Sequence, residues 1–315
     1  GEVLLDGGGL DKFTAISSNT YDESGDAGTV TVTVRDLLNM VNGAEIVSDT
    51  YSDGDAGKVN VSAGVLKMDE GGSGMRTSIS SEAVYGTGNA GTVSIRAVDL
   101  IQLIDNSKIS SSTSTEGNAG TVTATVRGLL ELLNGAKISS HTSDAGNAGS
   151  IAIEVTDLRI TGESTVISSL AEGSATGFAG NIRIQADTIT LSDKGQISIA
   201  AYQTLSGHQL INLPANSIHI DAERLHLQEN SRVTAESTAN VPASAIEIQS
   251  QNIVVEKESR ITTSSNNADG GSIDIQGDST VLRQGLISTS VEGISGNGGN
   301  ITITGSSPAD VLVMQ

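Results

Sequence analysis

The acidic residues whose spacing is most suggestive of chemistry lie in two turns near the N-terminus. One turn holds Asp22, Glu23 and Asp26, and a later turn holds Asp53 and Asp55. If the two turns lie one above the other, several carboxylates meet, and carboxylate oxygens are the ligands that Ca²⁺ takes. These five residues are therefore a candidate calcium site. The simpler interpretation is solvated turn acids, because the bidentate spacing of a dedicated calcium loop is missing. No other cofactor is expected.

Hydroxyl side chains recur at one position of a repeated apolar-Ser-Ser pattern. Because side chains alternate along a strand, the residue after each apolar one is expected to face outward. These residues would form a single column that could bind carbohydrate or ordered water, although Ser and Thr are also ordinary occupants of a solvated sheet face. The column consists of Ser80, Ser110, Ser139, Ser168, Ser198, Thr234, Thr262 and Ser288.

The four histidines do not indicate catalysis or a transition-metal site. His219 and His226 alternate with apolar residues and should face solvent, whereas His141 and His208 fall in a turn and an insertion. None has a second ligand at metal-binding spacing. We therefore expect surface histidines and no enzymatic activity.

The elements that must position these residues come from an internal repeat. A small residue precedes each run of alternating apolar residues, at intervals of 27 to 36 residues, and marks one unit. These anchors are Gly28, Gly57, Gly91, Gly120, Gly149, Gly180, Asn216, Ser244, Gly271 and Gly299. Each unit carries three short apolar segments with period two and leaves no room for a crossover helix.

This pattern predicts an all-β fold, a right-handed, three-sided parallel β-helix of about ten coils, continuous over residues 1–315. One coil cannot bury its apolar face alone, but coils stacked about 4.8 Å apart share a ladder of hydrogen bonds and one narrow core. Sequences such as Gly117-Asn118-Ala119-Gly120 are interpreted as corners in which Gly and Asn accept a positive φ. Two longer units predict insertions at 68–76 and 202–214.

Composition excludes several function classes. The net charge is −20 and the pI is about 4.4, which argue against nucleic-acid binding, since the phosphate backbone demands a basic face. No apolar run is long enough for a membrane span, so membrane insertion is not expected. The chain has no cysteine, so the coils must hold together without disulfides.

Units such as Gly146-Asn147-Ala148-Gly149-Ser150-Ile151-Ala152-Ile153, followed by Leu158 and Ile167-Ser168-Ser169, resemble the repeats of filamentous haemagglutinin-type exoproteins. The resemblance covers nearly the whole chain. It implies a long secreted β-helix, exported by two-partner secretion through an outer-membrane partner and acting in adhesion, biofilm formation or surface structure. The secretion domain of that family, with its Asn-Pro motifs, is absent from this sequence, so the segment corresponds to the repeat-bearing shaft.

The expected function is that of a structural shaft segment of a secreted bacterial adhesin or extracellular fibre, which acts by extended shape and multivalent contact. Its partners would be further coils of the same polypeptide or identical subunits end to end, together with glycans on cell surfaces. No cap is apparent at either end, so a filament subunit that stacks head to tail is the first alternative. A β-helix that binds or cleaves polysaccharide is the second.

Overall fold

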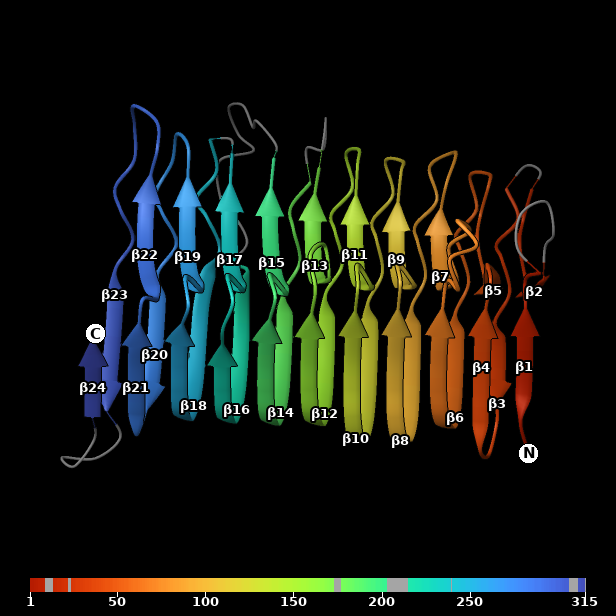
Figure 1. The fold of residues 1–315 in the computed structure, drawn as a ribbon. Helices are drawn as coiled ribbons and strands as arrows, with labels where there is room; N and C mark the ends of the chain where they lie inside the picture. The colour runs from red at the N-terminus through yellow and green to blue at the C-terminus, as the bar shows by residue number, and fades with distance from the viewer. Residues whose placement is uncertain are drawn as a thin grey trace.

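The structure, a computed structural model, describes residues 1–8, 14–21, 24–172, 177–202, 215–238, 240–305 and 311–314. These residues form a stack of parallel strands without a helix (Figure 1). Among them, therefore, no helix is long and apolar enough to cross a membrane. Val, Ile and Thr in strict alternation favour strands because β-branched side chains fit a pleated surface that is buried on one face. The predicted all-β parallel β-helix is confirmed.

The described strands form two parallel sheets, one of fourteen strands and one of ten, named sheet A and sheet B here. Sheet A contains β1 (Val3–Asp6), β3 (Val30–Thr33), β4 (Leu37–Val41), β6 (Val59–Asp69), β8 (Val93–Ile104), β10 (Val122–Leu133), β12 (Ile151–Thr161), β14 (Ile182–Ser192), β16 (Ser217–Leu227), β18 (Ala245–Glu256), β20 (Ile273–Gly277), β21 (Ser279–Arg283), β23 (Ile301–Gly305) and β24 (Val311–Met314). Sheet B contains β2 (Thr14–Ser17), β5 (Ala44–Val47), β7 (Ser78–Ala83), β9 (Lys108–Thr113), β11 (Lys137–Thr142), β13 (Val166–Ala171), β15 (Gln196–Ala201), β17 (Arg232–Ser237), β19 (Arg260–Ser265) and β22 (Leu286–Val291).

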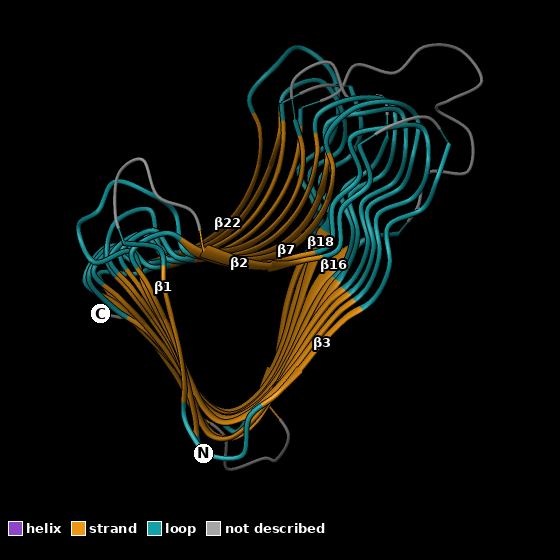
Figure 2. Ribbon diagram, turned by 90° about the vertical axis from the view of Figure 1, so that its right-hand side faces the viewer, coloured by secondary structure: helices purple, strands orange, loops and turns teal. Residues whose placement is uncertain are grey.

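Each central coil has two strands rather than the three short ones expected. The first and second apolar segments join into one long strand that bends, as in β8 and β10, and a register shift marks the bend in the β6–β8 and β10–β12 pairs. Figure 2, viewed along the stack, shows sheet A folded into two sides of a triangle, with sheet B as the third side. The three-sided shape is therefore as predicted, but two of its sides are one continuous sheet.

The core is a set of columns in which the same inward position repeats from coil to coil. In sheet B, Ile46 pairs with Ile79, Ile79 with Ile109 and Ile109 with Ile138, and all four are fully buried. The opposing columns of sheet A are equally buried, for example Leu66, Ile101 and Leu130. Aliphatic side chains of similar size can therefore fill the triangle without aromatic residues, which explains how a chain with six aromatic residues packs a core.

The glycine corners are where the repeat predicts them, but the physical reason for glycine differs from the expected one. Gly91, Gly120 and Gly149 do not have positive φ. Instead, a Cβ atom at Gly120 would lie 2.1 Å from the carbonyl oxygen of Gly91 in the preceding coil, and one at Gly149 would lie 2.0 Å from that of Gly120. Close stacking of backbones therefore excludes every side chain at these corners.

Positive φ occurs at a different corner, between sheet A and sheet B. Pairs such as Asp105-Asn106, Asp193-Lys194 and Glu229-Asn230 are left-handed at both residues, which turns the chain within two residues. The predicted insertion at 68–76 replaces this turn in one coil: eight residues, 70–77, connect β6 to β7, where three, 105–107, connect β8 to β9. Of the second predicted insertion, only Tyr202 lies within the described residues.

Candidate functional site

The outer face of sheet B carries three parallel rows of side chains, one residue per coil in each row. The strand register aligns Asp49 with Glu82, Glu82 with Ser112 and Ser112 with His141 in the outermost row. The predicted hydroxyl column is the middle row, and the third row includes Ser78, Lys108, Lys137 and Val166. Neighbouring strands lie about 4.8 Å apart, so residues that are 29 to 33 apart in sequence become adjacent.

The middle row confirms the predicted column and corrects its expected exposure. Its residues pair directly in register along eight strands. The row is not a flat, open array, because Ser110 has no exposed surface and the other members up to Thr234 have at most 7%. The chain rises away from the triangle after sheet B and loops lie on its other side, so sheet B lies between two raised parts of the backbone (Figure 2).

The second Ser of the Ile-Ser-Ser pattern has a structural role that the sequence did not reveal. Ser111 and Ser140 face inward and are fully buried. Ser140 Oγ donates to the Gly120 carbonyl oxygen at 3.1 Å and accepts the Gly149 N–H at 2.8 Å. Ser111 makes the equivalent bonds at 2.7 and 2.8 Å to Gly91 and Gly120. This inner column closes the glycine corners of successive coils, since buried backbone groups need partners.

A groove with a volume of about 460 Å³ lies over sheet B where the first insertion is located. Its floor comes from β9, β11 and β13, and one wall comes from the insertion. The lining residues are Glu70, Gly74, Arg76, Asn106, Lys108, Lys137, Ser139, His141, Val166, Ser168, Leu170 and Glu172. A volume of this size suits a small ligand. The longer connection of this unit therefore adds Glu70, Gly74 and Arg76 to a groove whose floor comes from regular coils.

Two carboxylates in and beside the groove, Glu70 in its lining and Glu82 next to Lys108, are engaged by neighbouring side chains. Glu70 accepts a hydrogen bond from Asn106 Nδ2 at 2.8 Å. Glu82 accepts one from Ser110 at 3.0 Å and forms an ion pair with Lys108 Nζ at 3.1 Å. Burial alone would raise the pKa of Glu82, but Lys108 and these hydrogen bonds hold it below its usual value. Glu82 is therefore ionised at neutral pH.

Asp49, one coil before Glu82, is in the opposite electrostatic situation. Burial and the nearby Glu82 carboxylate raise its pKa from 3.8 to about 7. Its Oδ1 accepts the Glu82 N–H at 2.8 Å, and its own N–H donates to Asn19 Oδ1 at 3.1 Å. Burial and Glu82 also raise the pKa of Glu45. Two neighbouring acids with pKa values driven apart are a known arrangement for acid–base chemistry, but Asp49 is only 7% exposed and offers a ligand little access.

His141 is directed into the groove and is predominantly neutral at pH 7. Burial lowers its pKa, against the opposing effect of Glu172, whose Oε2 lies 3.9 Å from Nδ1. A neutral imidazole has one donor and one acceptor. Next to it, the buried Oγ of Ser112 has no hydrogen-bond partner among the described residues. The outermost row therefore provides an imidazole, His141, and a hydroxyl, Ser112, whose hydrogen-bonding capacity is not fully satisfied within the coils.

The acids predicted to bind calcium are partly stacked, as expected, but they belong to a longer ladder. Asp26 Oδ1 accepts the Asp55 N–H at 2.9 Å, and Asp55 Oδ1 accepts the N–H and Nδ2 of Asn89 at 2.8 and 2.9 Å. The ladder continues through Asn118 and Asn147 with distances of 2.8 to 3.2 Å. In the described part of the chain, no three acidic, histidine or cysteine residues are grouped to hold a metal.

The remaining acids do not settle the calcium prediction. Asp53 accepts a hydrogen bond from Thr87 Oγ1 at 3.4 Å, outside the ladder. Asp22 and Glu23 lie outside the described residues. The calcium site stays a prediction, while the ladder assigns Asp26 and Asp55 a role in coil stacking.

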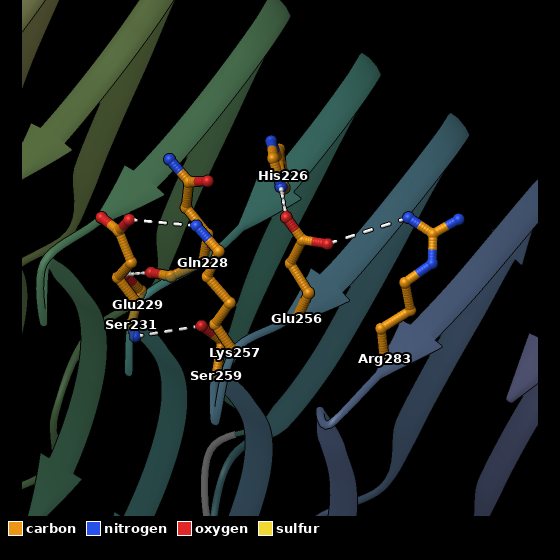
Figure 3. Close-up of polar contacts among 8 residues, drawn as sticks. All are labelled: His226, Gln228, Glu229, Ser231, Glu256, Lys257, Ser259 and Arg283. Carbon is orange, nitrogen blue, oxygen red and sulfur yellow. Dashed lines mark hydrogen bonds and ion pairs between the residues drawn. The ribbon is translucent and has the colours of Figure 1, made fainter. Parts of the chain in front are cut away.

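The two outward histidines of sheet A, His219 and His226, are partly exposed, and each lies close to a carboxylate of the next coil. His226 Nε2 lies 3.1 Å from Glu256 Oε1, and the other oxygen of Glu256 lies 3.8 Å from Arg283 in the next coil (Figure 3). Close by, Lys257 pairs with Glu229 at 3.1 Å, and His219 faces Glu247 at 3.2 Å. His208 lies outside the described residues. Each of these contacts joins consecutive coils. Side-chain ion pairs therefore link neighbouring coils on the outside of the stack, in addition to the backbone hydrogen bonds of the sheets.

Three tyrosines form an aromatic ladder on the first coils. Tyr21 and Tyr51 are stacked, with ring centroids 5.1 Å apart and planes 11° apart, and Tyr85 follows at 6.2 Å. The stacked faces of Tyr21 and Tyr51 cover each other along the axis, so this pair contributes mainly to coil stacking rather than offering a flat platform to a ligand.

Comparison with known protein families, with characterised proteins and with solved structures gives no match. The resemblance of the repeats to filamentous haemagglutinin therefore remains an expectation from the residues alone. The fold is an elongated β-solenoid, and the groove over sheet B is where the first insertion meets the regular coils.

Proposed function

We propose that the chain is a shaft segment of a secreted bacterial adhesin or extracellular fibre, which works by extended shape and repeated weak contacts. The observation that carries the proposal is that polar side chains are used mainly to join one coil to the next. The Asp26–Asn147 ladder, the inner serine column and the ion pairs of Figure 3 all run along the axis. A chain whose contacts are all between nearest neighbours extends by adding coils and suits a rod-shaped spacer.

Labelling of intact producing cells with an antibody raised against the purified chain tests this proposal. Surface label that is removed by an added protease, while a cytosolic marker is retained, would support a surface shaft. Label that appears only after the cells are permeabilised would refute it. Export through an outer-membrane partner is tested in the same cells by deleting the partner's gene, which should abolish the surface signal.

Head-to-tail stacking is a second candidate, favoured by the last described coil. Ile301, Ile303 and Leu312 are 43%, 38% and 49% exposed there, whereas equivalent apolar residues in the inner coils are buried. Another coil placed on this end, from the same polypeptide or from a second copy, would cover them. Negative-stain microscopy of the purified chain, with and without millimolar Ca²⁺, separates the two: long fibres one β-helix wide support stacking of copies, and short monomeric rods refute it.

A further inference from the structure

The groove over sheet B is lined by three cations and two carboxylates, Glu70 and Glu172, in a strongly acidic protein. Arg76, Lys108 and Lys137 line it, out of 17 basic residues set against 37 acidic ones. Lys108 is neutralised by Glu82. Neither Arg76 nor Lys137 forms an ion pair with any described residue, and both are exposed. The charge of Arg76 lowers the pKa of the nearby Glu45 and Glu82 carboxylates without forming an ion pair with them. Arg76 and Lys137 are therefore the two groove cations that can still pair with an external anion.

The position of Lys137 adds to this argument. Lys108 and Lys137 are direct partners in the parallel ladder, so their side chains leave adjacent strands from equivalent positions. Like charges placed opposite each other in a sheet are unfavourable. Glu82 relieves this repulsion for Lys108 alone, because it lies on the far side from Lys137, in β7. Arg76 belongs to the coil of β7, two coils from Lys137, so an anion that lies over Lys108 and contacts both of these cations would provide the missing compensation.

The rest of the groove indicates what the anion is attached to. Beyond Lys137, in the next coil, Val166 and Leu170 form an apolar part of the floor, and each is only partly buried. Ser139, His141 and Glu172 provide donors and acceptors beside this floor. A sugar ring has an apolar C–H face and a rim of hydroxyls, so a ring carrying one carboxylate matches both halves of the groove.

We infer that this groove binds a carboxylated sugar residue, with its carboxylate at Arg76 and Lys137 and its ring over Val166 and Leu170. Arg76 provides a planar fork of donors for a carboxylate, and Lys137 adds a point charge from the floor. The neutral imidazole of His141 and the Glu172 carboxylate receive ring hydroxyls. This inference concerns the side of the rod and does not depend on where the cell places the chain, so it goes beyond the shaft proposal.

The test uses the purified chain and matched pairs of methyl glycosides. Glucuronic, galacturonic and mannuronic acid glycosides are each compared with the neutral parent sugar in NMR titrations at low ionic strength. We expect at least one uronide to bind at least tenfold more tightly than its neutral counterpart, although a net charge of −20 repels it. If no uronide binds, or if inorganic phosphate competes as strongly as an equal concentration of the best uronide, the inference is overturned.

Variants then place the binding in the groove. Arg76→Gln combined with Lys137→Gln should weaken uronide binding at least tenfold, leave the circular dichroism spectrum unchanged and not lower the melting temperature, because both side chains are exposed and Lys137 repels Lys108. The matched control is Arg127→Gln with Lys67→Gln, which removes the same two charges from exposed positions on sheet A. Equal weakening in the control pair would show general electrostatic attraction and overturn the assigned site.

Discussion

Replacing Asp49 with Asn is expected to stabilise the protein in a pH-dependent way. Burial and Glu82 raise the Asp49 pKa from 3.8 to about 7, so the folded state holds a proton that the unfolded state has lost between these values. Stability contributed by this group therefore falls as pH rises from about 4 to about 7 and is constant outside that window. Since one pKa unit is worth about 1.4 kcal/mol, the ionised carboxylate costs the folded state about 4 kcal/mol above pH 7.

Asn at this position keeps an oxygen that accepts the Glu82 N–H, so the backbone contact survives the substitution. Urea unfolding between pH 4 and pH 8.5 measures the effect: Asp49→Asn and the wild type should coincide near pH 4 and diverge up to pH 7. Asp274→Asn, an exposed acid on sheet A, controls for the change in net charge and should shift stability by a small amount. If the Asp49→Asn and wild-type curves stay parallel over the whole range, the reasoning about burial at this site is refuted.

Three further predictions test how the coils are stacked, each by the urea midpoint of a purified variant. Gly120→Ala places a Cβ atom 2.1 Å from a backbone oxygen and should cost more than about 3 kcal/mol or prevent folding, whereas Gly25→Ala, with its nearest atom at 3.6 Å, should be tolerated. Ser140→Ala leaves buried backbone groups unpaired and should cost about 2 kcal/mol, whereas Ser114→Ala at an exposed position should cost little; equal losses would contradict the role of the inner column. Asn118→Ala interrupts the amide ladder and should cost about 1 kcal/mol, and an unchanged midpoint would exclude its role in stacking.

The repeat could be read from the sequence because the solenoid imposes one rule on every coil. An inward apolar residue such as Ile109 must recur one coil later as Ile138, and the interval between them is visible without any knowledge of the structure. The column from Ser80 to Ser288 followed from the same rule. Its burial did not, because the rise of the chain after sheet B depends on curvature, which side-chain alternation does not encode.

Glycine at the corners illustrates a second limit. Glycine is compatible both with a positive φ and with close backbone approach, and the sequence Gly117-Asn118-Ala119-Gly120 does not distinguish the two. The structure assigns close approach to these corners and positive φ to pairs such as Asp193-Lys194, which contain no glycine. Glycine in the sequence therefore predicts where a corner lies, but it does not predict the backbone conformation of that corner.

The groove was hidden for a different reason: its residues come from separate coils and from an insertion, and only the strand register brings them together. Lys108, His141 and Leu170 occupy outward positions, where the core places no demand on the side chain. Because each coil depends only on its neighbours, an outward position can change without loss of the fold. A solenoid can thus keep a uniform inner pattern for stability while a few outward substitutions and one insertion create a binding surface. Departures from the repeat, rather than the repeat itself, are where specificity is expected in such a rod.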